Sequence, residues 1–156
     1  MIEVDVPGWR CLELGTLVLD LNGTLAVDGS LLPVHSSVAE LQKRLEICLL
    51  SADTHGTLDS VAAELGVRAL RLKPGGGESQ QKAQFVRELG PDSVAAVGNG
   101  ANDVGMLEIA GLSLAVLGDE GCAVDAIRAS DLLVGSADEA LELLLRPQRL
   151  VASLRR

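Results

Sequence analysis

The hydrophobic and polar positions of the chain form two kinds of segment. Short apolar runs, rich in Val and Leu, have the length and composition of strands that are buried on both faces. Longer segments that carry apolar residues three and four positions apart follow most of these runs, as amphipathic helices do. Because strand and helix alternate with short connections, the pattern predicts parallel strands joined by helices.

The pattern assigns residue ranges to both kinds of element. Strands are predicted at residues 17–20, 46–50, 67–72, 93–97, 112–117 and 131–134. Helices are predicted at residues 33–45, 53–65, 80–89, 104–110, 121–129 and 137–145, and Asp53 and Thr54 have the character of helix-start residues. The predicted fold class is α/β, a three-layer sandwich around a doubly wound parallel sheet.

Three smaller features flank this core. Residues 2–6 alternate apolar and acidic side chains, and residues 11–14 are predicted to return beside them after a Pro-Gly turn. Asp28-Gly29, within residues 25–32, is a strong hairpin signal and predicts a flap beside the end of the first buried strand. The tail at residues 146–156 is rich in arginine; it fits a solvated end or a docked helix, and a phosphate-binding or membrane role is a third alternative.

Length and composition restrict the function. The 156 residues suit one domain, spanning 1–156, with no internal linker. A formal charge of −9, with one Trp, one Phe and no Tyr, argues against a nucleic-acid partner. The three cysteines lie far apart without zinc spacing, and no apolar run approaches a membrane span, so we expect a cytoplasmic protein without a membrane partner.

Polar residues follow three of the predicted strands, where packing alone favours apolar ones. Asp20 ends the first strand, Ser51 follows the second, and Asn99 to Asp103 follow the fourth. If these strands are neighbours in a parallel sheet, their carboxyl ends share one crevice, which is where such sheets bind ligands. Lys82 belongs to the helix that leads into the fourth strand, so it is placed to reach the same crevice.

This set of residues suits phosphoryl transfer through an enzyme carboxylate. Asp20 is the predicted nucleophile, and water later hydrolyses the aspartyl phosphate. Asp20 and Asp103 are the predicted carboxylate ligands of a Mg²⁺ ion. The hydroxyl of Ser51, the ammonium of Lys82 and the backbone amides of residues 21–23 are predicted to contact the phosphoryl oxygens.

Each of these residues also has an interpretation without catalysis. Asp20 to Gly23 has the composition of a plain turn. Ser51 and Asp53 are typical of residues that cap the next helix, Asp103 is typical of a residue that complements a helix N-terminus, and Lys82 fits a solvated helix position. All of them fall at the same end of the predicted sheet, which favours the catalytic interpretation.

The motifs resemble those of the haloacid dehalogenase superfamily of aspartate-nucleophile phosphohydrolases. The first motif of that family, hhhDxDGT/V, reads Leu-Val-Leu-Asp-Leu-Asn-Gly-Thr at residues 17–24, and the second is a strand that ends in Ser51. The third corresponds to Lys82, and the fourth, GDGxND, reads Gly-Asn-Gly-Ala-Asn-Asp at residues 98–103. The resemblance covers residues 14 to about 134, in the order and spacing of the family.

The resemblance implies a role for each matched position. It implies catalytic roles for Asp20, Asn22, Ser51 and Lys82, and a metal site at Asp20, Asn22, Asn99 and Asp103, with the backbone carbonyl of Asn22 as one ligand. It implies phosphate binding by Leu21, Asn22, Gly23, Ser51, Ala52 and Lys82. The chain is most similar to soluble, uncapped proteins related to the phosphorylation domains of P-type ATPases. Uncapped relatives exclude water by forming oligomers or by acting on macromolecules, so the flap hairpin is a candidate contact in a homo-oligomer.

Two positions depart from the family pattern. Most phosphatases of the superfamily have an Asp two residues after the nucleophile, which serves as general acid and then as general base. Asn22 cannot transfer a proton at pH 7, and loss of such help costs on the order of 10²–10⁴-fold in rate. Asn99 replaces the first acid of the fourth motif, which predicts weaker magnesium binding.

The expected function is therefore a slow, magnesium-dependent phosphohydrolase that favours phosphorylated small molecules with good leaving groups. The alternative is a regulatory or binding module that keeps the fold and turns over little. A dinucleotide-binding domain is disfavoured because no GxGxxG follows the first buried strand. His55, Glu78 and the flap are the remaining candidates for substrate contacts.

Overall fold

A parallel six-stranded sheet forms the centre of the computed structural model, which describes residues 1–53 and 55–156. The strands lie in the order β10-β9-β8-β3-β6-β7, and every neighbouring pair is parallel. Their bounds are β3 Thr16–Asp20, β6 Glu46–Ser51, β7 Arg68–Arg71, β8 Val94–Gly98, β9 Leu112–Val116 and β10 Leu132–Val134. The predicted α/β class and doubly wound parallel sheet are confirmed.

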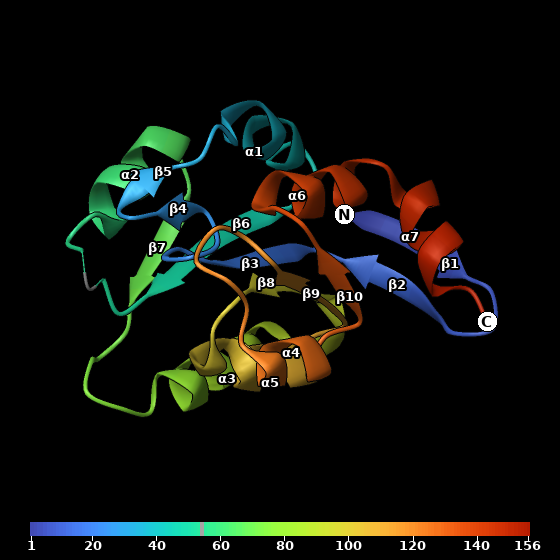
Figure 1. Ribbon diagram of the computed structural model, residues 1–156. Helices are drawn as coiled ribbons and strands as arrows, with labels where there is room; N and C mark the ends of the chain where they lie inside the picture. The colour runs from blue at the N-terminus through green and yellow to red at the C-terminus, as the bar shows by residue number, and fades with distance from the viewer. Residues whose placement is uncertain (54) are drawn as a thin grey trace.

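Helices cover both faces of this sheet (Figure 1). One face carries α1 (His35–Leu41), α2 (Leu58–Leu65) and α6 (Ala137–Leu145); the other carries α3 (Glu78–Leu89), α4 (Val104–Ile109) and α5 (Val124–Arg128). Successive side chains of β3 alternate between the two layers: Leu17 and Leu19 belong to the first core, and Val18 to the second. This double burial explains why the strand sequence is continuously apolar.

The N-terminal hairpin stands at one end of the molecule, beside the C-terminal helix (Figure 1). Strands β1 (Ile2–Val6) and β2 (Arg10–Leu14) pair antiparallel, as predicted. Helix α7 (Pro147–Leu154) contacts β1, and the amide of Arg156 donates to the carbonyl of Pro7 at 3.0 Å. Of the alternatives for the arginine-rich tail, the structure therefore has the docked helix.

The predicted flap is present as a short hairpin. It consists of β4 (Ala26–Val27) and β5 (Ser30–Leu31), which pair antiparallel. Asp28 and Gly29 have φ values of +49° and +79°, the left-handed pair that a two-residue turn of this type requires.

Three predicted helices are shorter by at least four residues in the structure. The helix predicted at 33–45 comprises His35–Leu41, and the one predicted at 121–129 comprises Val124–Arg128. The helix predicted from residue 53 begins at Leu58, because Asp53 has a φ of +55°, outside the helical region, and its carboxylate accepts the amide of Leu58 at 2.9 Å. Thr54 lies outside the described residues. Two short 3₁₀ turns, η1 (Pro91–Ser93) and η2 (Ala101–Asp103), flank β8.

The strand order fixes where a site can form. After β3 the chain builds β6 and β7 on one side and then returns to place β8 on the other side of β3. A crevice forms outside the carboxyl ends of strands at such a reversal. The carboxyl ends of β3, β6 and β8 are therefore neighbours, as the sequence predicted. No helix among the described residues is both long and apolar enough to cross a membrane.

Candidate active site

The last residues of three adjacent strands form the floor of the site. Asp20 ends β3 level with Leu50 of β6, so Ser51 stands one residue beyond it. On the other side, Leu19 pairs with Val97, which places Gly98 beside Asp20. Asp20 and Ser51 are only 4% and 3% exposed. The structure thus brings a carboxylate and a hydroxyl to one buried edge.

Lys82 joins this floor from the layer below. It belongs to α3, is fully buried, and its Nζ lies 2.6 Å from Asp20 Oδ1 and 2.5 Å from Asp103 Oδ1. A buried ammonium between two buried carboxylates is stable only as a paired set, because each charge has lost its water. This arrangement confirms that Asp20, Lys82 and Asp103 lie together, and it excludes the solvated alternative for Lys82.

Burial controls the ionisation of the central carboxylate. Loss of water and then the charge of Asp103 raise the pKa of Asp20 from 3.8 to about 7, while Lys82 and the hydroxyl of Thr24 act in the opposite direction. Burial lowers the pKa of Lys82, but Asp20 and Asp103 together outweigh that effect and raise it. Lys82 is therefore a permanent cation here, and Asp20 titrates near neutral pH.

Thr24 links the first and fourth motifs. Its hydroxyl oxygen lies 3.1 Å from Asp20 Oδ2 and 3.1 Å from Asn99 Oδ1. The chain can approach this closely because Gly23 has a φ of +84° and no side chain: a Cβ there would lie 2.5 Å from Asn99 Nδ2. The carboxylate of Asp20 and the amide oxygen of Asn99 are consequently brought together at the hydroxyl of Thr24.

Asp103 is held from two directions. Oδ1 accepts from Lys82, and Oδ2 accepts the backbone amides of Asn99 and Gly100 at 2.9 and 2.8 Å. Gly98 makes room for this carboxylate, since a Cβ at that position would lie 2.5 Å from Asp103 Cγ. Asp103 therefore reaches the site through Lys82 and also ties down the loop after β8.

The hydroxyl of Ser51 accepts two hydrogen bonds. Asn22 Nδ2 donates to Ser51 Oγ at 3.2 Å, and the amide of Asp53 donates to it at 2.9 Å. With both acceptor positions in use, the Ser51 proton is directed elsewhere and is available to a phosphoryl oxygen. The Asp53 carboxylate pairs with Arg71, and backbone hydrogen bonding and that pairing outweigh burial and lower its pKa.

Some of the backbone groups predicted to contact phosphate have other partners in the structure. The amide of Gly23 donates to the carbonyl of Ala26 at 2.7 Å, so in this structure it serves the turn and is not directed at a phosphate. Leu21 supplies a carbonyl that accepts three amides of the same turn. Ala52 is the first residue beyond the end of β6 and is partly exposed. The anion-binding role proposed for residues 21–23 therefore does not extend to the Gly23 amide.

The donor set suits a hard divalent cation. Asp20 supplies a carboxylate oxygen and Asn99 an amide oxygen, and both lie 3.1 Å from the hydroxyl oxygen of Thr24. Mg²⁺ is typically bound by a few protein oxygens of this kind and keeps several water ligands. Within the part of the chain that the structure describes, no group of three or more His, Cys, Asp or Glu side chains is arranged for a metal ion. The two asparagines account for this, since amides stand where acids are more usual.

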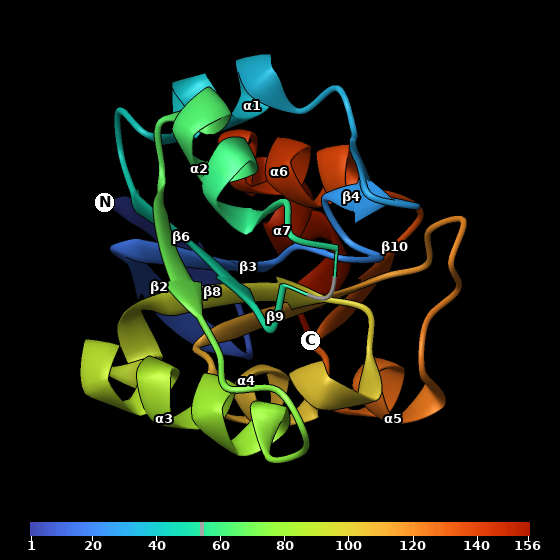
Figure 2. The same cartoon turned by 90° about the vertical axis from the view of Figure 1, so that its left-hand side faces the viewer.

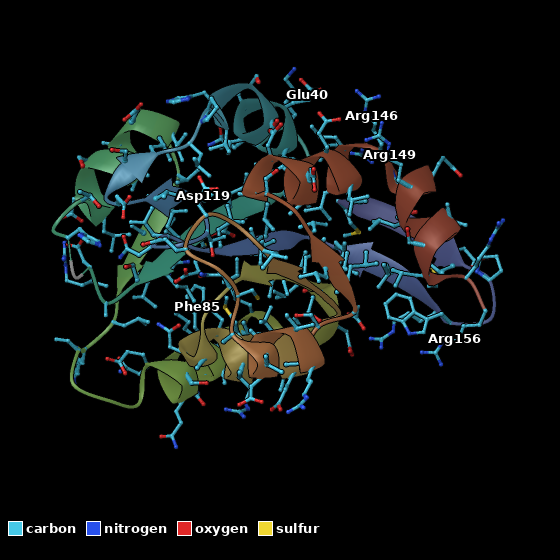
Figure 3. All side chains as sticks on the ribbon, viewed as in Figure 1. Glu40, Phe85, Asp119, Arg146, Arg149 and Arg156 are labelled. Carbon is cyan, nitrogen blue, oxygen red and sulfur yellow. The ribbon has the colours of Figure 1, made fainter. Side chains whose placement is uncertain are left out.

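The other candidate contacts have local partners. Glu78 Oε1 accepts the amides of Gly75 and Gly76 at 3.1 and 3.3 Å, so it fixes the glycine loop before α3. His55 lies beside the tip of the hairpin, within 4 Å of where a Cβ of Gly29 would be. Asp119 lies in the loop after β9, which passes near the same hairpin (Figure 3). His55 thus lies against the hairpin, which also lines a small pocket together with Thr24 and Asp119.

Sequence reasoning assigned no role to two residues of the site. Thr24 bridges Asp20 and Asn99, and its place in the first motif was the available signal. The backbone of Asp53 orients Ser51, and nothing in its sequence neighbourhood indicated a left-handed conformation there. The loop after β9 also supports the site: the carbonyl of Gly121 accepts from Asn99 Nδ2 at 3.1 Å.

Comparison with known sequences gives one informative relative. No protein-family model matches the chain. An uncharacterized protein of Methanocaldococcus jannaschii is 38% identical over 84 residues, which are 51% of this chain and 90% of that protein.

Comparison with solved structures gives a consistent fold. A Streptomyces avermitilis protein described as a HAD family hydrolase superposes with a TM-score of 0.67 at 20% identity, covering 97% of this chain and 88% of that one. The 3-deoxy-D-manno-octulosonate 8-phosphate phosphatase of Moraxella catarrhalis, solved with magnesium, phosphate and the sugar acid, gives 0.67 at 18% identity and 90% of each chain. The catalytic domain of a CPx-ATPase gives 0.61 at 22% identity, covering 74% of this chain and 46% of that one.

Proposed function

Because this chain belongs to the family of the Methanocaldococcus protein and has the haloacid dehalogenase-like fold, we propose that it is a metal-dependent phosphohydrolase whose nucleophile is Asp20. The observation that carries the proposal is the buried set of Asp20, Lys82 and Asp103 at the carboxyl end of β3, with the hydroxyl of Ser51 beside it. Nothing in the packing of an α/β core calls for two carboxylates and an ammonium at this place.

The proposed reaction has two steps. A carboxylate oxygen of Asp20 attacks phosphorus, the bond to the leaving oxygen breaks, and an aspartyl phosphate forms. Water then attacks the same phosphorus, which releases inorganic phosphate and restores the carboxylate. The ammonium of Lys82 favours the ionised form of Asp20 and orients its carboxylate, and the proton of Ser51 is donated to a phosphoryl oxygen.

We propose that the cation is Mg²⁺. The carboxylate of Asp20, the backbone carbonyl of Asn22 and the amide oxygen of Asn99 would hold it, and Asp103 would contribute its charge from behind Lys82. The ion would offset the negative charge that develops on the phosphoryl oxygens. With one formal carboxylate facing the ion, we expect weaker binding than at a site with two.

Asn22 determines which substrates are practical. An amide cannot protonate a departing alkoxide or deprotonate the attacking water, so both steps lose general acid–base help. Its Nδ2 instead donates to Ser51 and so helps to aim the Ser51 proton. The phenolate of an aryl phosphate and the carboxylate of an acyl phosphate depart readily without protonation, whereas the alkoxide of a sugar phosphate does not. The protein should therefore turn over slowly and prefer aryl and acyl phosphates.

The test compares leaving groups across matched variants. Hydrolysis of p-nitrophenyl phosphate, acetyl phosphate and a panel of sugar phosphates is measured with Mg²⁺ for the wild type, Asp20→Asn and Asn22→Asp. Asp20→Asn should abolish all activity, and Asn22→Asp should raise kcat on sugar phosphates by about 10²-fold with less effect on the aryl ester. Gln148→Glu, which adds the same charge at an exposed position of α7, is the control. No gain for Asn22→Asp on sugar phosphates would show that the missing acid is not the limitation.

A second candidate function is a binding module that turns over little. The two asparagines in place of acids favour it, together with a nucleophile that is only 4% exposed. Incubation with Mg²⁺ and beryllium fluoride separates the two. A competent nucleophile forms a stable mimic of the aspartyl phosphate, which should raise the melting temperature of the wild type but not that of Asp20→Asn. If the protein is only a binding module, the melting temperature should not rise.

We also propose that hairpin β4–β5 contacts a second copy of the chain. The hairpin lies beside His55 and lines a small pocket with Thr24 of the site, so a neighbour's hairpin would cover the crevice and exclude water from it. Light scattering on wild type and on a variant with residues 26–31 replaced by a Gly-Ser turn measures this. If the wild type is monomeric, the proposed hairpin contact is wrong, and the proposed phosphohydrolase reaction is unaffected.

A further inference from the structure

A groove of about 890 Å³ lies between the edge of the sheet and helix α3, apart from the catalytic residues. Strand β7 is the last strand on this side of the sheet, and in Figure 2 it is the green strand that faces the viewer above α3. Leu70 and Leu72 line the groove from the strand side, and Phe85 lines it from α3, on the lower face of the sheet (Figure 3). The groove thus combines an apolar lining with an edge strand.

Part of the backbone of β7 faces the outer edge of the sheet, beside this groove. The amide of Leu72 donates to the carbonyl of Ser51 at 2.8 Å, and Leu70 is in register with Leu50, so these residues direct their backbone groups toward β6. In a parallel ladder the intervening residues direct theirs away from the neighbouring strand. The amides and carbonyls of Ala69, Arg71 and Lys73 therefore face outward.

The outward-facing backbone groups of Lys73 are already hydrogen-bonded to the side-chain amide of Gln81, in a pattern that resembles strand pairing. The backbone amide of Lys73 donates to Gln81 Oε1 at 2.9 Å, and Gln81 Nε2 donates to the carbonyl of Lys73 at 2.9 Å. This reciprocal pair is what a peptide group of an added strand would form. Gln81 protects one end of the edge, and the positions of Ala69 and Arg71 remain for an incoming chain.

The charge around the groove differs from that of the whole protein. Arg71, Lys73 and Arg87 line it against a single acid, Glu88, although the chain carries a net charge of −9. Arg71 is paired with Asp53 and Asp59, but among residues 1–53 and 55–156 no ion pair involves Lys73 or Arg87. The unneutralised cations favour an acidic occupant.

The sequence of the edge disfavours a second copy of the chain. The outward groups of this strand belong to Ala69 and Arg71, so antiparallel pairing of two copies centred on Arg71 would set that side chain directly opposite Arg71 of the other copy. Like charges directly opposite across a ladder are destabilising. Edge arginines and lysines are a common means of preventing self-pairing of this kind.

We propose that this groove binds an acidic, extended peptide segment of a partner protein, which adds to β7 as a seventh strand of the sheet. Its backbone pairs with Ala69 and Arg71, its apolar side chains lie over Leu70 and Phe85, and its carboxylates face Lys73 and Arg87. Main-chain pairing supplies affinity in this mode of recognition, and the side chains supply selectivity. The proposal is independent of the phosphohydrolase function.

The experiment uses a labelled eight-residue peptide of alternating Glu and Val on the full chain. Binding is measured by fluorescence anisotropy, and amide exchange by NMR. We expect saturable binding, slower exchange of the Ala69 and Arg71 amides, and about tenfold weaker binding to the Lys73→Glu/Arg87→Glu variant. Arg128→Glu, an exposed charge reversal on α5, is the matched control and should bind as the wild type does.

Two control peptides separate strand addition from simple charge attraction. A peptide of the same sequence, N-methylated at alternate residues on its pairing edge, keeps its charge but loses its donors, and should bind at least about tenfold more weakly. A peptide with Lys in place of Glu should not bind. Equal binding of the methylated peptide, or unchanged exchange at Ala69 and Arg71, would overturn the proposal, and neither result depends on a variant that folds poorly.

Discussion

Lowering the pH from about 8 to about 5 should protonate Asp20 in the folded, metal-free protein. This protonation by itself should raise the free energy of unfolding. Burial, and then the charge of Asp103, raise the pKa of this carboxyl from 3.8 to about 7 in the folded state. Between these two values the folded chain binds a proton that the unfolded chain does not. Stability therefore increases as the pH falls through 7 and is lost as the pH rises through it.

The size of the effect follows from the shift. Three pKa units correspond to about 4 kcal/mol when the carboxyl is fully ionised, and about 2–3 kcal/mol of this appears between pH 8 and pH 5. No discount for solvent is needed, because Asp20 is only 4% exposed. For a chain of this length the change corresponds to about 5–10 °C in melting temperature.

The assay is urea denaturation followed by circular dichroism, with EDTA present, at several pH values. Other groups also titrate in this range, so the quantity compared is the difference between the wild type and Asp20→Asn. The variant has no carboxyl at this position and should lack the wild-type slope. Asp92→Asn removes an exposed carboxylate and should retain it.

Parallel curves for the wild type and Asp20→Asn would refute the reasoning. They would mean that Lys82 compensates Asp20 completely and that the nucleophile stays ionised throughout. The opposite slope, with stability lost on acidification through 7, would mean that ion pairing outweighs burial. Either result would also change the expected pH dependence of catalysis.

Three further changes test other parts of the site. Asn99→Asp adds a second acid beside Asp20, and calorimetry should show about tenfold tighter Mg²⁺ binding, whereas unchanged affinity would place the ion elsewhere. Lys82→Met leaves Asp20 and Asp103 buried without a cation, so urea denaturation at pH 8 should show a loss of about 3–5 kcal/mol, smaller at pH 5; a pH-independent loss would contradict the charge argument. Gly23→Ala forces a side chain into a left-handed position 2.5 Å from Asn99 Nδ2, and should cost about 2 kcal/mol and weaken Mg²⁺ binding, while wild-type behaviour of both would argue against that contact.

The sequence alone determined the layers of the fold and most of the candidate chemistry. Continuous apolar runs indicated strands buried on both faces, and their alternation with amphipathic segments indicated a parallel sheet. Asp20 and Ser51 stood out because polar residues ended strands that packing alone would keep apolar. Local signals such as Asp28-Gly29 placed a turn correctly, because the conformation there depends on those two residues.

Only the tertiary structure decided how these pieces meet. The sequence placed Lys82 on a helix that leads toward the crevice, but its full burial between Asp20 and Asp103 depends on α3 lying under β3 and β8. The left-handed backbone of Asp53 shortened the predicted helix, and the carboxylate of Asp53 pairs with Arg71 from the neighbouring strand β7, a contact that the sequence does not reveal. Burial and charge at a site are sums over residues that are distant in the chain. Local pattern fixes which elements form, whereas the pKa of Asp20 and the outward face of β7 exist only once the sheet is assembled.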